Sequence, residues 1–372
     1  MLPSRDADHP TESIFPVTSS APVARRRNTL SSSLGLGEKL FASSDERKFA
    51  QAIEDGLAAV EVGLLKEMSF SDDLADVTSR YLLDAGGKRV RPVLTLLTAQ
   101  LGEGNNDAVI AAAQGVEITH LASLYHDDVM DEAQMRRGVP SAQTVWGNSV
   151  AILTGDLLFA RASKIVASLG ERAIQLQADT FERLCLGQLH ETIGPRAGED
   201  PIEHYLKVLA DKTGSLIATA GQVGVLFSNA SEDYVEPVVQ FGERIGVAFQ
   251  LIDDVIDLAP GEDETGKTPG TDLRAGVATL PLLYLRRMAV DDRDAADLLA
   301  RIDRDVTSGD VAESSDLVDA IAELRDHEVT RMTLAEAHRW SADAVAALAP
   351  LPKGPVKKAL TKFADTIVDR SS

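Results

Sequence analysis

The chain has 372 residues, of which 44% are hydrophobic and 26% are charged, a composition typical of a globular protein with a sizeable core. The formal net charge of -21 argues against nucleic acid or an anionic membrane surface as the main partner. The single cysteine, Cys185, allows no intrachain disulfide, no apolar stretch is long enough for a membrane span, and the acidic N-terminus does not resemble a secretory signal. We therefore expect a cytoplasmic protein.

Residues 1–44 are rich in Ser, Pro and Arg and are predicted to form a disordered tail. From residue 45 to residue 372 the apolar residues recur at helical spacing, as in FAQAIEDGLAAVEVGLLKEM, and no run alternates like a strand. Clusters of Gly, Pro, Asn and Ser separate the helices, as in APGEDETGKTPG and APLPKGP. The sequence predicts one all-α domain, a single large helical bundle.

Two clusters of aspartates each follow an apolar helical stretch. The first contains Asp127, Asp128 and Asp131, and the second, DDVID, begins at Asp253 and ends at Asp257. Positions i, i+1 and i+4 of a helix fall within an arc of about 100°, so the carboxylates of each cluster repel one another. A solvated acidic face explains one such cluster as well as a site does, but two are harder to explain in that way. Oxygen ligands without His or Cys suit Mg²⁺ held together with a phosphate, and the spacing is not that of an EF-hand.

Basic residues accompany these clusters in an otherwise acidic chain, as a phosphate site requires. Lys88 and Arg91 follow two glycines in AGGKRVRP, and Arg136 and Arg137 come just after the first aspartate cluster. Lys212 and Lys267 lie in DKTGS and GKTPGTD. GGK lacks the spacing of a P-loop, and each basic residue taken alone could simply be solvated. Their occurrence together predicts a Mg²⁺–phosphate site.

The motifs GGKRVRP, HDDVMDEAQMRRG, GQLHE, DKTGS, FQLIDDVID and GKTPGTD resemble, in order and approximate spacing, those of the trans-isoprenyl diphosphate synthases. The resemblance covers roughly residues 80–285. It implies an isoprenoid synthase fold with a central active-site cavity and a homodimeric enzyme. The implied reaction extends an allylic diphosphate with isopentenyl diphosphate and releases diphosphate, which takes up the final proton.

The resemblance also implies a role for each matching residue. Three Mg²⁺ ions would be bound with the substrate, two by Asp127 and Asp131 and the third by Asp253, with support from Asp128 and Asp257. The allylic diphosphate would be bound by Arg136, Lys212 and Lys267. Isopentenyl diphosphate would be bound by Lys88, Arg91, His120 and Arg137. The dipoles of Thr213 and Gln250 would face the developing carbocation. For His120, an ordinary packed core histidine remains an alternative, and His126 is expected to be a packed helix residue or a partner of a ligand.

The chain departs from the family pattern at two positions. Val277 stands where the family often has Lys, which removes one phosphate contact, and Glu191 in GQLHE stands where Asp is common.

Product length is a separate question. Ala122 and Ser123 lie one helical turn before Asp127, where a bulky aromatic residue in the family stops chain growth. Their small side chains predict a medium or long polyprenyl product, and a product of farnesyl or geranylgeranyl length is the alternative. Phe159 could form a deeper floor or be ordinary core.

Three other functions remain open at this point. A class I terpene cyclase also ionises diphosphates, but its second metal motif usually has an N-D-x-x-S-x-x-x-E character and it has no use for GGKRVRP. A non-catalytic subunit of a heteromeric synthase usually lacks the acidic motifs that this chain keeps. A different all-α enzyme of Mg²⁺-dependent diphosphate chemistry is the third.

Overall fold

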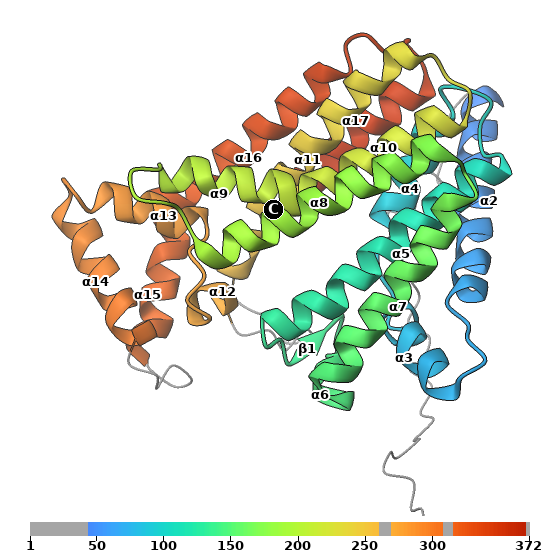
Figure 1. Cartoon of the computed structure of the whole chain (residues 1–372). Coiled ribbons are helices and arrows are strands. Elements are labelled where there is room, and N and C mark those ends of the chain that lie inside the picture. Colours follow the sequence, from blue (N-terminus) through green and yellow to red (C-terminus); the bar gives the residue numbers. More distant parts are fainter. Residues whose placement is uncertain (1–43, 260–268, 308–314, 370–372) are drawn as a thin grey trace, which may run out of the picture.

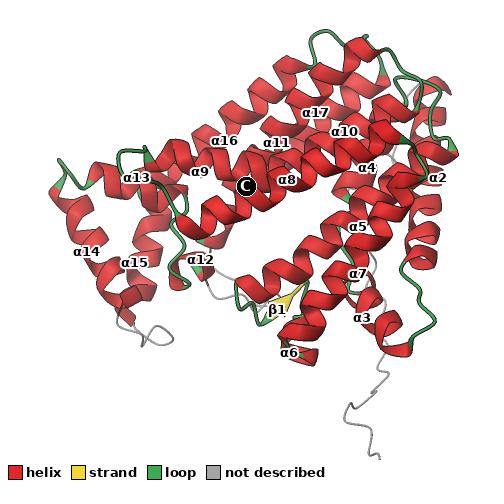
Figure 2. Cartoon of the chain, viewed as in Figure 1, coloured by secondary structure: helices red, strands yellow, loops and turns green. Residues whose placement is uncertain are grey.

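The computed structural model describes residues 44–259, 269–307 and 315–369, and nearly all of the elements in them are helices (Figures 1 and 2). The expected all-α fold is therefore confirmed. The elements are α2 (Ser44–Glu67), α3 (Asp73–Asp84), α4 (Val90–Ala99), α5 (Asp107–Met130), β1 (Met135–Arg136), β2 (Val139–Pro140), α6 (Ala142–Trp146), α7 (Asn148–Ala167), α8 (Glu171–Ile193), α9 (Pro201–Leu209), the π-helical turn η1 (Ala210–Gly214), α10 (Ser215–Phe227), the short 3₁₀ helix η2 (Glu232–Tyr234), α11 (Val235–Asp257), α12 (Thr271–Arg274), α13 (Leu280–Met288), α14 (Arg293–Thr307), α15 (Ser315–Asp326), α16 (Glu328–Ala347) and α17 (Pro355–Val368).

Local capping explains where several helices begin. The side chain of Asn106 accepts a hydrogen bond from the Val109 N–H at the start of α5, and Asp72 caps α3 in the same way. Asp200 accepts from two backbone N–H groups of α9, whose first residue is Pro201. The two long helices α5 and α11 carry the aspartate clusters at their C-terminal ends.

The helix α10 lies at the centre of the bundle. Its residues from Ser215 to Gly221 are all buried, which is the pattern of a helix surrounded by other helices. It packs against α4, α5 and α11, and α5 packs against α7 along their length, while α16 covers α11 (Figure 1). A second apolar core lies between α2, α5 and α7, and a third holds α13, α14 and α15 together. In Figure 1 the α14–α15 pair projects from the bundle.

A small β-hairpin, which the sequence did not predict, follows α5. Met135 pairs with Pro140 and Arg136 with Val139, and the turn between them consists of Arg137 and Gly138, both with positive φ. That is the backbone of a two-residue hairpin turn. Strands of two residues are too short to show an alternating pattern, so the sequence offered no signal for them. Among the described residues, no helix is both long and apolar enough to cross a membrane.

Candidate active site

The first aspartate cluster lies where α5 ends. Asp127 is half-buried and Asp131 is the exposed residue that follows the helix. Burial, together with the neighbouring charges of Asp131 and Glu191, raises the pKa of Asp127 to about 6, although Lys212 and Arg136 act in the opposite direction. The negative charge at this helix end is therefore not fully compensated by the protein.

The side chain of Asp128 lies inside the protein. It is fully buried, and its Oδ1 accepts a hydrogen bond of 2.6 Å from Nε of Arg136 on β1. Its Oδ2 is buried and has no hydrogen-bond partner among the described residues. Asp128 thus ties the hairpin to the end of α5 through one carboxylate oxygen, while the other is buried without a partner in the described part of the chain.

The second cluster, like the first, contains one buried carboxylate and others that are less buried. Asp253 and Asp257 are half-buried at the end of α11, and the carboxylate of Asp257 accepts hydrogen bonds from the backbone N–H groups of Thr271 and Asp272 at the start of α12. Asp254 is buried and accepts hydrogen bonds from the Tyr205 hydroxyl at 2.8 Å and from the Leu280 N–H at 3.3 Å. Burial raises the pKa of Asp254 to about 8.

Asp272 joins the two clusters electrostatically. Burial raises its pKa to about 6, and the charges of Asp257, Asp253, Glu191 and Asp131 contribute further in that order. Because a carboxylate on α12 is affected by carboxylates of both α11 and the end of α5, the two clusters face a common space. Asp272 was not among the residues expected to bind metal, although it lies in the GKTPGTD motif.

No three His, Cys, Asp or Glu residues in the described part of the chain lie close enough to hold a metal ion by themselves. The donor set nevertheless fits Mg²⁺, which binds through one or two carboxylates and takes its other ligands from water and substrate phosphate. The unpartnered Oδ2 of Asp128, and the pKa values of Asp127 and Asp272, which burial and neighbouring carboxylates raise, fit a site at which a divalent cation would be favourable.

Lys212 projects from the π-helical turn η1, between α9 and α10. In this turn the Ser215 N–H donates to the carbonyl of Ala210, five residues earlier. The Lys212 ammonium pairs with Glu191 on α8, and although burial disfavours its charge, Glu191 and Asp127 together raise its pKa. The departure from Asp to Glu at residue 191 therefore keeps a carboxylate beside Lys212.

Two further features hold η1 against its neighbours. Arg183 on α8 donates to Asp211 of η1 at 3.0 Å and also pairs with Glu243 on α11. Gly187 lets α8 approach closely, because a Cβ at this position would lie 2.6 Å from the backbone nitrogen of Lys212. Lys212 and Thr213 are thus carried by a turn that is fixed from two sides.

The residues predicted to bind isopentenyl diphosphate come together between α3, α4, α5 and the hairpin. Burial lowers the pKa of Arg91 to about 10, and the Nε of Arg91 is buried without a hydrogen-bond partner among the described residues. His120 has a pKa well below 6.5 because it is buried beside Arg91, Arg137 and other arginines, so it stays neutral at physiological pH. Burial also lowers the pKa of Arg137, and Lys88 is exposed on the loop before α4.

The other predicted positions are placed as follows. Thr213 is half-buried on η1, and Gln250 is half-buried on α11. Val277 is exposed in the segment between α12 and α13, and Lys267 lies outside the described residues. Nε2 of His126 lies 3.1 Å from the Ile152 carbonyl and 3.3 Å from Asp156, with its ring against Phe159, so His126 packs against α7.

An apolar cavity lies beneath the charged end of α5. The space in it that a water-sized sphere can reach is only about 30 Å³, within about 400 Å³ of non-atom space that includes open solvent. Its wall is formed by α5, the end of α7, α8 and α10, through Ala112, Gly115, Val116, Thr119, Val166, Leu169, Ala173, Leu176, Gln177, Thr180, Leu216, Thr219, Val223 and Phe227. With a rise of 1.5 Å per residue, the α5 part of this wall lies about 12 to 22 Å below Asp127.

The hydroxyl groups in the wall are engaged with one another or with the backbone. Thr119 donates to the Gly115 carbonyl, Thr219 donates to the Ser215 carbonyl, and the hydroxyls of Thr180 and Thr219 lie 2.7 Å apart. With their polar groups satisfied in this way, the threonines add little polarity to the cavity.

The residues predicted to set product length lie at a different level. Ala122 is fully buried in the core between α2, α5 and α7, and Ser123, which is half-buried, donates its hydroxyl to the His120 carbonyl. Phe159 packs against the same core and against Phe181 on α8, their ring centroids 4.5 Å apart. Neither Ala122 nor Ser123 is part of the cavity wall, which is formed one turn and more below them. Their role in chain length stays a prediction.

Comparison with known proteins gives a consistent result. The sequence matches the family model of polyprenyl synthetases over residues 72–318. A nonaprenyl diphosphate synthase of Mycobacterium tuberculosis is 44% identical over 323 residues, which are 87% of this chain and 94% of that protein.

Solved structures agree with the sequence relatives. A geranylgeranyl pyrophosphate synthase of Corynebacterium glutamicum, complexed with calcium and isoprenyl diphosphate, is 41% identical with a TM-score of 0.74, over 87% of this chain and 98% of that one. A polyprenyl synthase of Caulobacter crescentus, in a complex of the same kind, is 30% identical with a TM-score of 0.77, over 88% of this chain and 98% of that one. The chain therefore belongs to the polyprenyl synthetase family and is a trans-prenyltransferase.

Proposed function

We propose that this prenyltransferase extends an allylic diphosphate with isopentenyl diphosphate and releases a medium- or long-chain all-trans polyprenyl diphosphate. The observation that carries the proposal is the arrangement of one site. Carboxylates from the ends of α5 and α11 face a common space together with Lys212, and the apolar cavity lies directly below along α5. A diphosphate head and a hydrocarbon tail on one substrate match these two regions.

The residues that would hold Mg²⁺ are Asp127 and Asp131 on one side and Asp253 on the other, with Asp128 and Asp257 in support. When bound, Mg²⁺ supplies Lewis-acid stabilisation of the leaving diphosphate. The calcium bound with isoprenyl diphosphate in two solved relatives supports a divalent ion in this role. The proposed number of three ions rests on the family resemblance.

Each group of side chains then has a defined task. Lys212 and Arg136, with Lys267, bind the allylic diphosphate and stabilise its charge as the bond between C1 and oxygen breaks. Lys88, Arg91, His120 and Arg137 hold isopentenyl diphosphate so that its terminal carbon forms the new bond to C1. The dipoles of Thr213 and Gln250 face the allylic cation. The alkene of isopentenyl diphosphate is the nucleophile, and the proton lost from the isopentenyl unit passes to the released diphosphate, so no side chain is required as a nucleophile or as a general base.

The depth of the cavity supports the longer product. The wall residues Thr119 and Ala112 lie about 12 Å and about 22 Å below Asp127, well past the level of Ala122 and Ser123. The 44% identical relative is named a nonaprenyl diphosphate synthase, which is in line with this reading. The geranylgeranyl-length alternative has support of its own, in the name of the solved relative from Corynebacterium glutamicum.

We also propose that the enzyme is a homodimer that works in the cytoplasm. Large apolar side chains are exposed on α7, where Leu153 is 65% exposed, and at several positions of α8, where Ile193 is 69% exposed. Such a surface on neighbouring helices fits a second copy of the chain. The single Cys185 suits a reducing compartment.

The test of function is incubation of the purified protein with farnesyl diphosphate, labelled isopentenyl diphosphate and Mg²⁺, with and without a chelator. Chain-extended products that form only with metal support the proposal, and their length is read by chromatography after removal of the diphosphate. Failure to incorporate label with any allylic primer overturns it, and a cyclised hydrocarbon indicates a terpene cyclase instead. The dimer is tested by light scattering, which should show two chains per particle for the wild type and one chain for Leu153→Glu.

A further inference from the structure

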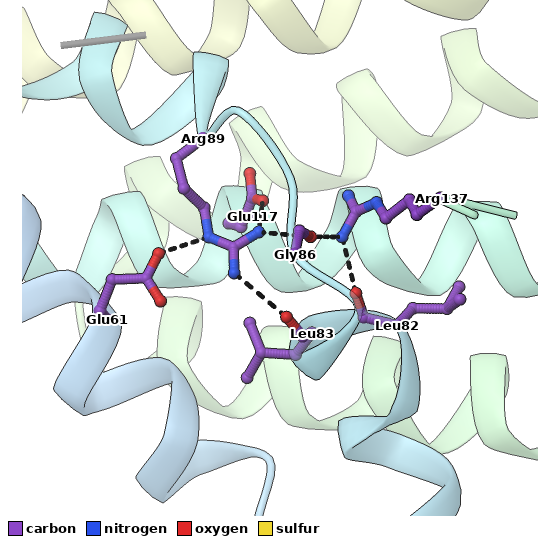
Figure 3. Close-up of polar contacts among 7 residues, drawn as sticks. All are labelled: Glu61, Leu82, Leu83, Gly86, Arg89, Glu117 and Arg137. Carbon is purple, nitrogen blue, oxygen red and sulfur yellow. Dashed lines mark hydrogen bonds and ion pairs between the residues drawn. The ribbon is translucent and has the colours of Figure 1, made fainter. Parts of the chain in front are cut away.

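Arg89 lies beside the predicted isopentenyl diphosphate residues but is directed into the protein. Its side chain is 1% exposed, between α2, the end of α3 and α5 (Figure 3). Its Nε donates to Glu61 on α2 at 2.5 Å, and its Nη2 donates to the Leu83 carbonyl at 3.4 Å. Its Nη1 donates to the Gly86 carbonyl at 3.1 Å and lies 3.5 Å from a carboxylate oxygen of Glu117 on α5. Each nitrogen of the guanidinium thus has a partner, so Arg89 is not available to a substrate.

The guanidinium of Arg137 also binds the loop between α3 and α4. Arg137, from the turn of the hairpin, donates to the carbonyls of Leu82 and Gly86, so that the Gly86 carbonyl accepts from both arginines (Figure 3). Gly87 lies against both side chains, since a Cβ there would be 2.8 Å from Nη1 of Arg89 and 3.0 Å from Cζ of Arg137. The loop between α3 and α4 is therefore held at its carbonyl and has no space in which to move toward the arginines.

The backbone of Arg89 is itself unusual. Its φ of 54° lies in the left-handed region, which is unfavourable for a residue other than glycine. This conformation turns the Arg89 side chain inward while Lys88, the residue before it, is exposed and Arg91, in the first turn of α4, is half-buried. The contacts of the guanidinium are what maintain it.

Glu117 completes the arrangement as a buried negative charge. It is 2% exposed, and its charge acts on Arg91 and Arg137 as well as on Arg89. Burial raises the pKa of Glu117, and the three arginines oppose that rise. A carboxylate surrounded by arginines balances part of their mutual repulsion before any diphosphate is bound.

We propose that Arg89 is a positioning residue for isopentenyl diphosphate. Held by Glu61 and Glu117, it fixes the loop that presents Lys88 and Arg91, and it does not itself contact the substrate. The inference rests on the proposed function, because it concerns the binding of one of the two substrates proposed there. It assigns to the second basic residue of GGKRVRP a task different from that of its neighbours.

The test is Arg89→Lys, which keeps the positive charge but offers one nitrogen in place of a fork that reaches three elements. We expect the KM for isopentenyl diphosphate to rise on the order of tenfold to a hundredfold, as for a small misplacement of a binding group. The KM for the allylic diphosphate, and kcat at saturating isopentenyl diphosphate, should stay within about twofold of wild type. This split distinguishes positioning of one substrate from a general loss of structure.

The matched control is Arg161→Lys. Arg161 on α7 pairs at 3.5 Å with Glu67 on α2, the helix that also carries Glu61, and it lies over the Phe70 ring, away from the loop between α3 and α4. Both KM values of this variant should equal those of wild type. If Arg89→Lys leaves both KM values unchanged, or raises both together, the positioning role is wrong.

A milder variant covers the case in which Arg89→Lys does not fold. Glu61→Gln removes the charge of a partner that is 24% exposed, and it should raise the KM for isopentenyl diphosphate alone, by a smaller factor. An unchanged KM in a folded Glu61→Gln protein overturns the proposal. A wild-type protein that incorporates no isopentenyl unit overturns the proposed function itself, whereas an active wild type with an unaltered Arg89→Lys overturns only the role of Arg89.

Discussion

The hydroxyl of Tyr205 donates a hydrogen bond of 2.8 Å to the buried carboxyl group of Asp254 and so joins α9 to the end of α11. Tyr205→Phe removes this donor and leaves a buried oxygen with only the Leu280 N–H, at 3.3 Å. The free energy of unfolding should fall by about 1–3 kcal/mol, measured by urea denaturation. As a control, Tyr284→Phe should have a smaller effect, since the described residues supply no hydrogen-bond partner for that hydroxyl. Equal effects of the two substitutions would contradict the anchoring role of Asp254.

Asp127→Ala should separate activity from stability. Asp127 is one of the proposed metal ligands, so turnover should fall at least about a hundredfold. The folded protein disfavours the charge of Asp127, first through burial and then through Asp131, although Lys212 and Arg136 act in the opposite direction. The free energy of unfolding measured with a chelator should therefore stay equal or rise. Asp297→Ala, at an exposed position of α14, should change neither quantity. Retained activity in Asp127→Ala would remove this residue from the metal site.

Metal and diphosphate should bind cooperatively. No three carboxylates or imidazoles of the described chain are close enough to hold one ion alone, so phosphate oxygens are needed to complete the coordination. In a thermal unfolding experiment, Mg²⁺ and inorganic diphosphate together should raise Tm by more than the sum of their separate shifts. A chelator should reduce the shift to that of diphosphate alone. The full shift with Mg²⁺ alone would show that a complete metal site exists without substrate.

The cavity wall and the predicted length residues can be tested against each other. Thr119→Phe places an aromatic ring in the cavity and should shorten the products, analysed by chromatography after dephosphorylation. Ala122→Phe is also predicted to shorten them, but it inserts a ring into a packed core and should cost about 1–3 kcal/mol of stability. Val290→Phe, at a highly exposed position, should leave product length unchanged. An unaltered product in Thr119→Phe would exclude the cavity as the path of the growing chain.

His120 should make the stability of the protein depend on pH. Burial and the charges of Arg91 and Arg137 keep its pKa well below 6.5 in the folded state, whereas the unfolded chain takes up a proton near that pH. Unfolding therefore binds a proton below about pH 6.5, and the contribution of His120 to the free energy of unfolding falls as the pH decreases. The limit is about 1.36 kcal/mol per pH unit.

The measurement is urea unfolding of wild type and His120→Gln at pH 5, 6 and 7 in the presence of a chelator. The free energy of unfolding of the wild type minus that of His120→Gln should increase as the pH rises from 5 to 7. Asp127 and Asp272, whose pKa values are raised to about 6, titrate in the opposite sense, but they are present in both proteins and largely cancel in the difference. A difference that does not vary with pH would place His120 in water in the folded state.

The sequence predicted the parts of the fold and site that depend on local spacing. Helical periodicity gave the all-α class, and the two aspartate clusters are indeed carried by the ends of α5 and α11. The direction of each carboxylate was beyond the sequence. Asp128 and Asp254 are turned inward by Arg136 and by Tyr205, partners that only the tertiary fold brings near them.

The same limit applies to the basic residues. Lys88, Arg89 and Arg91 look equivalent in GGKRVRP, and only the left-handed backbone of Arg89 separates the buried residue from its neighbours. Glu117 could have been noticed as the one acidic residue in the middle of the apolar stretch AVIAAAQGVEITHLAS. Asp272 could have been noticed as the carboxylate that ends GKTPGTD, but its closeness to Asp253 and Asp131 could not, because these residues come from other elements.

The π-helical turn at Ala210–Gly214 determines how α10 is rotated about its axis relative to α9. Each residue advances a helix by about 100°, so a turn with one extra residue sets the angular phase of everything that follows. Lys212 lies within the turn, and the cavity-lining Leu216 and Thr219 lie just after it. Deleting one residue here would rotate the apolar wall by more than a quarter of a circle relative to α9. One residue thus keeps Lys212 and the apolar wall of the cavity in register.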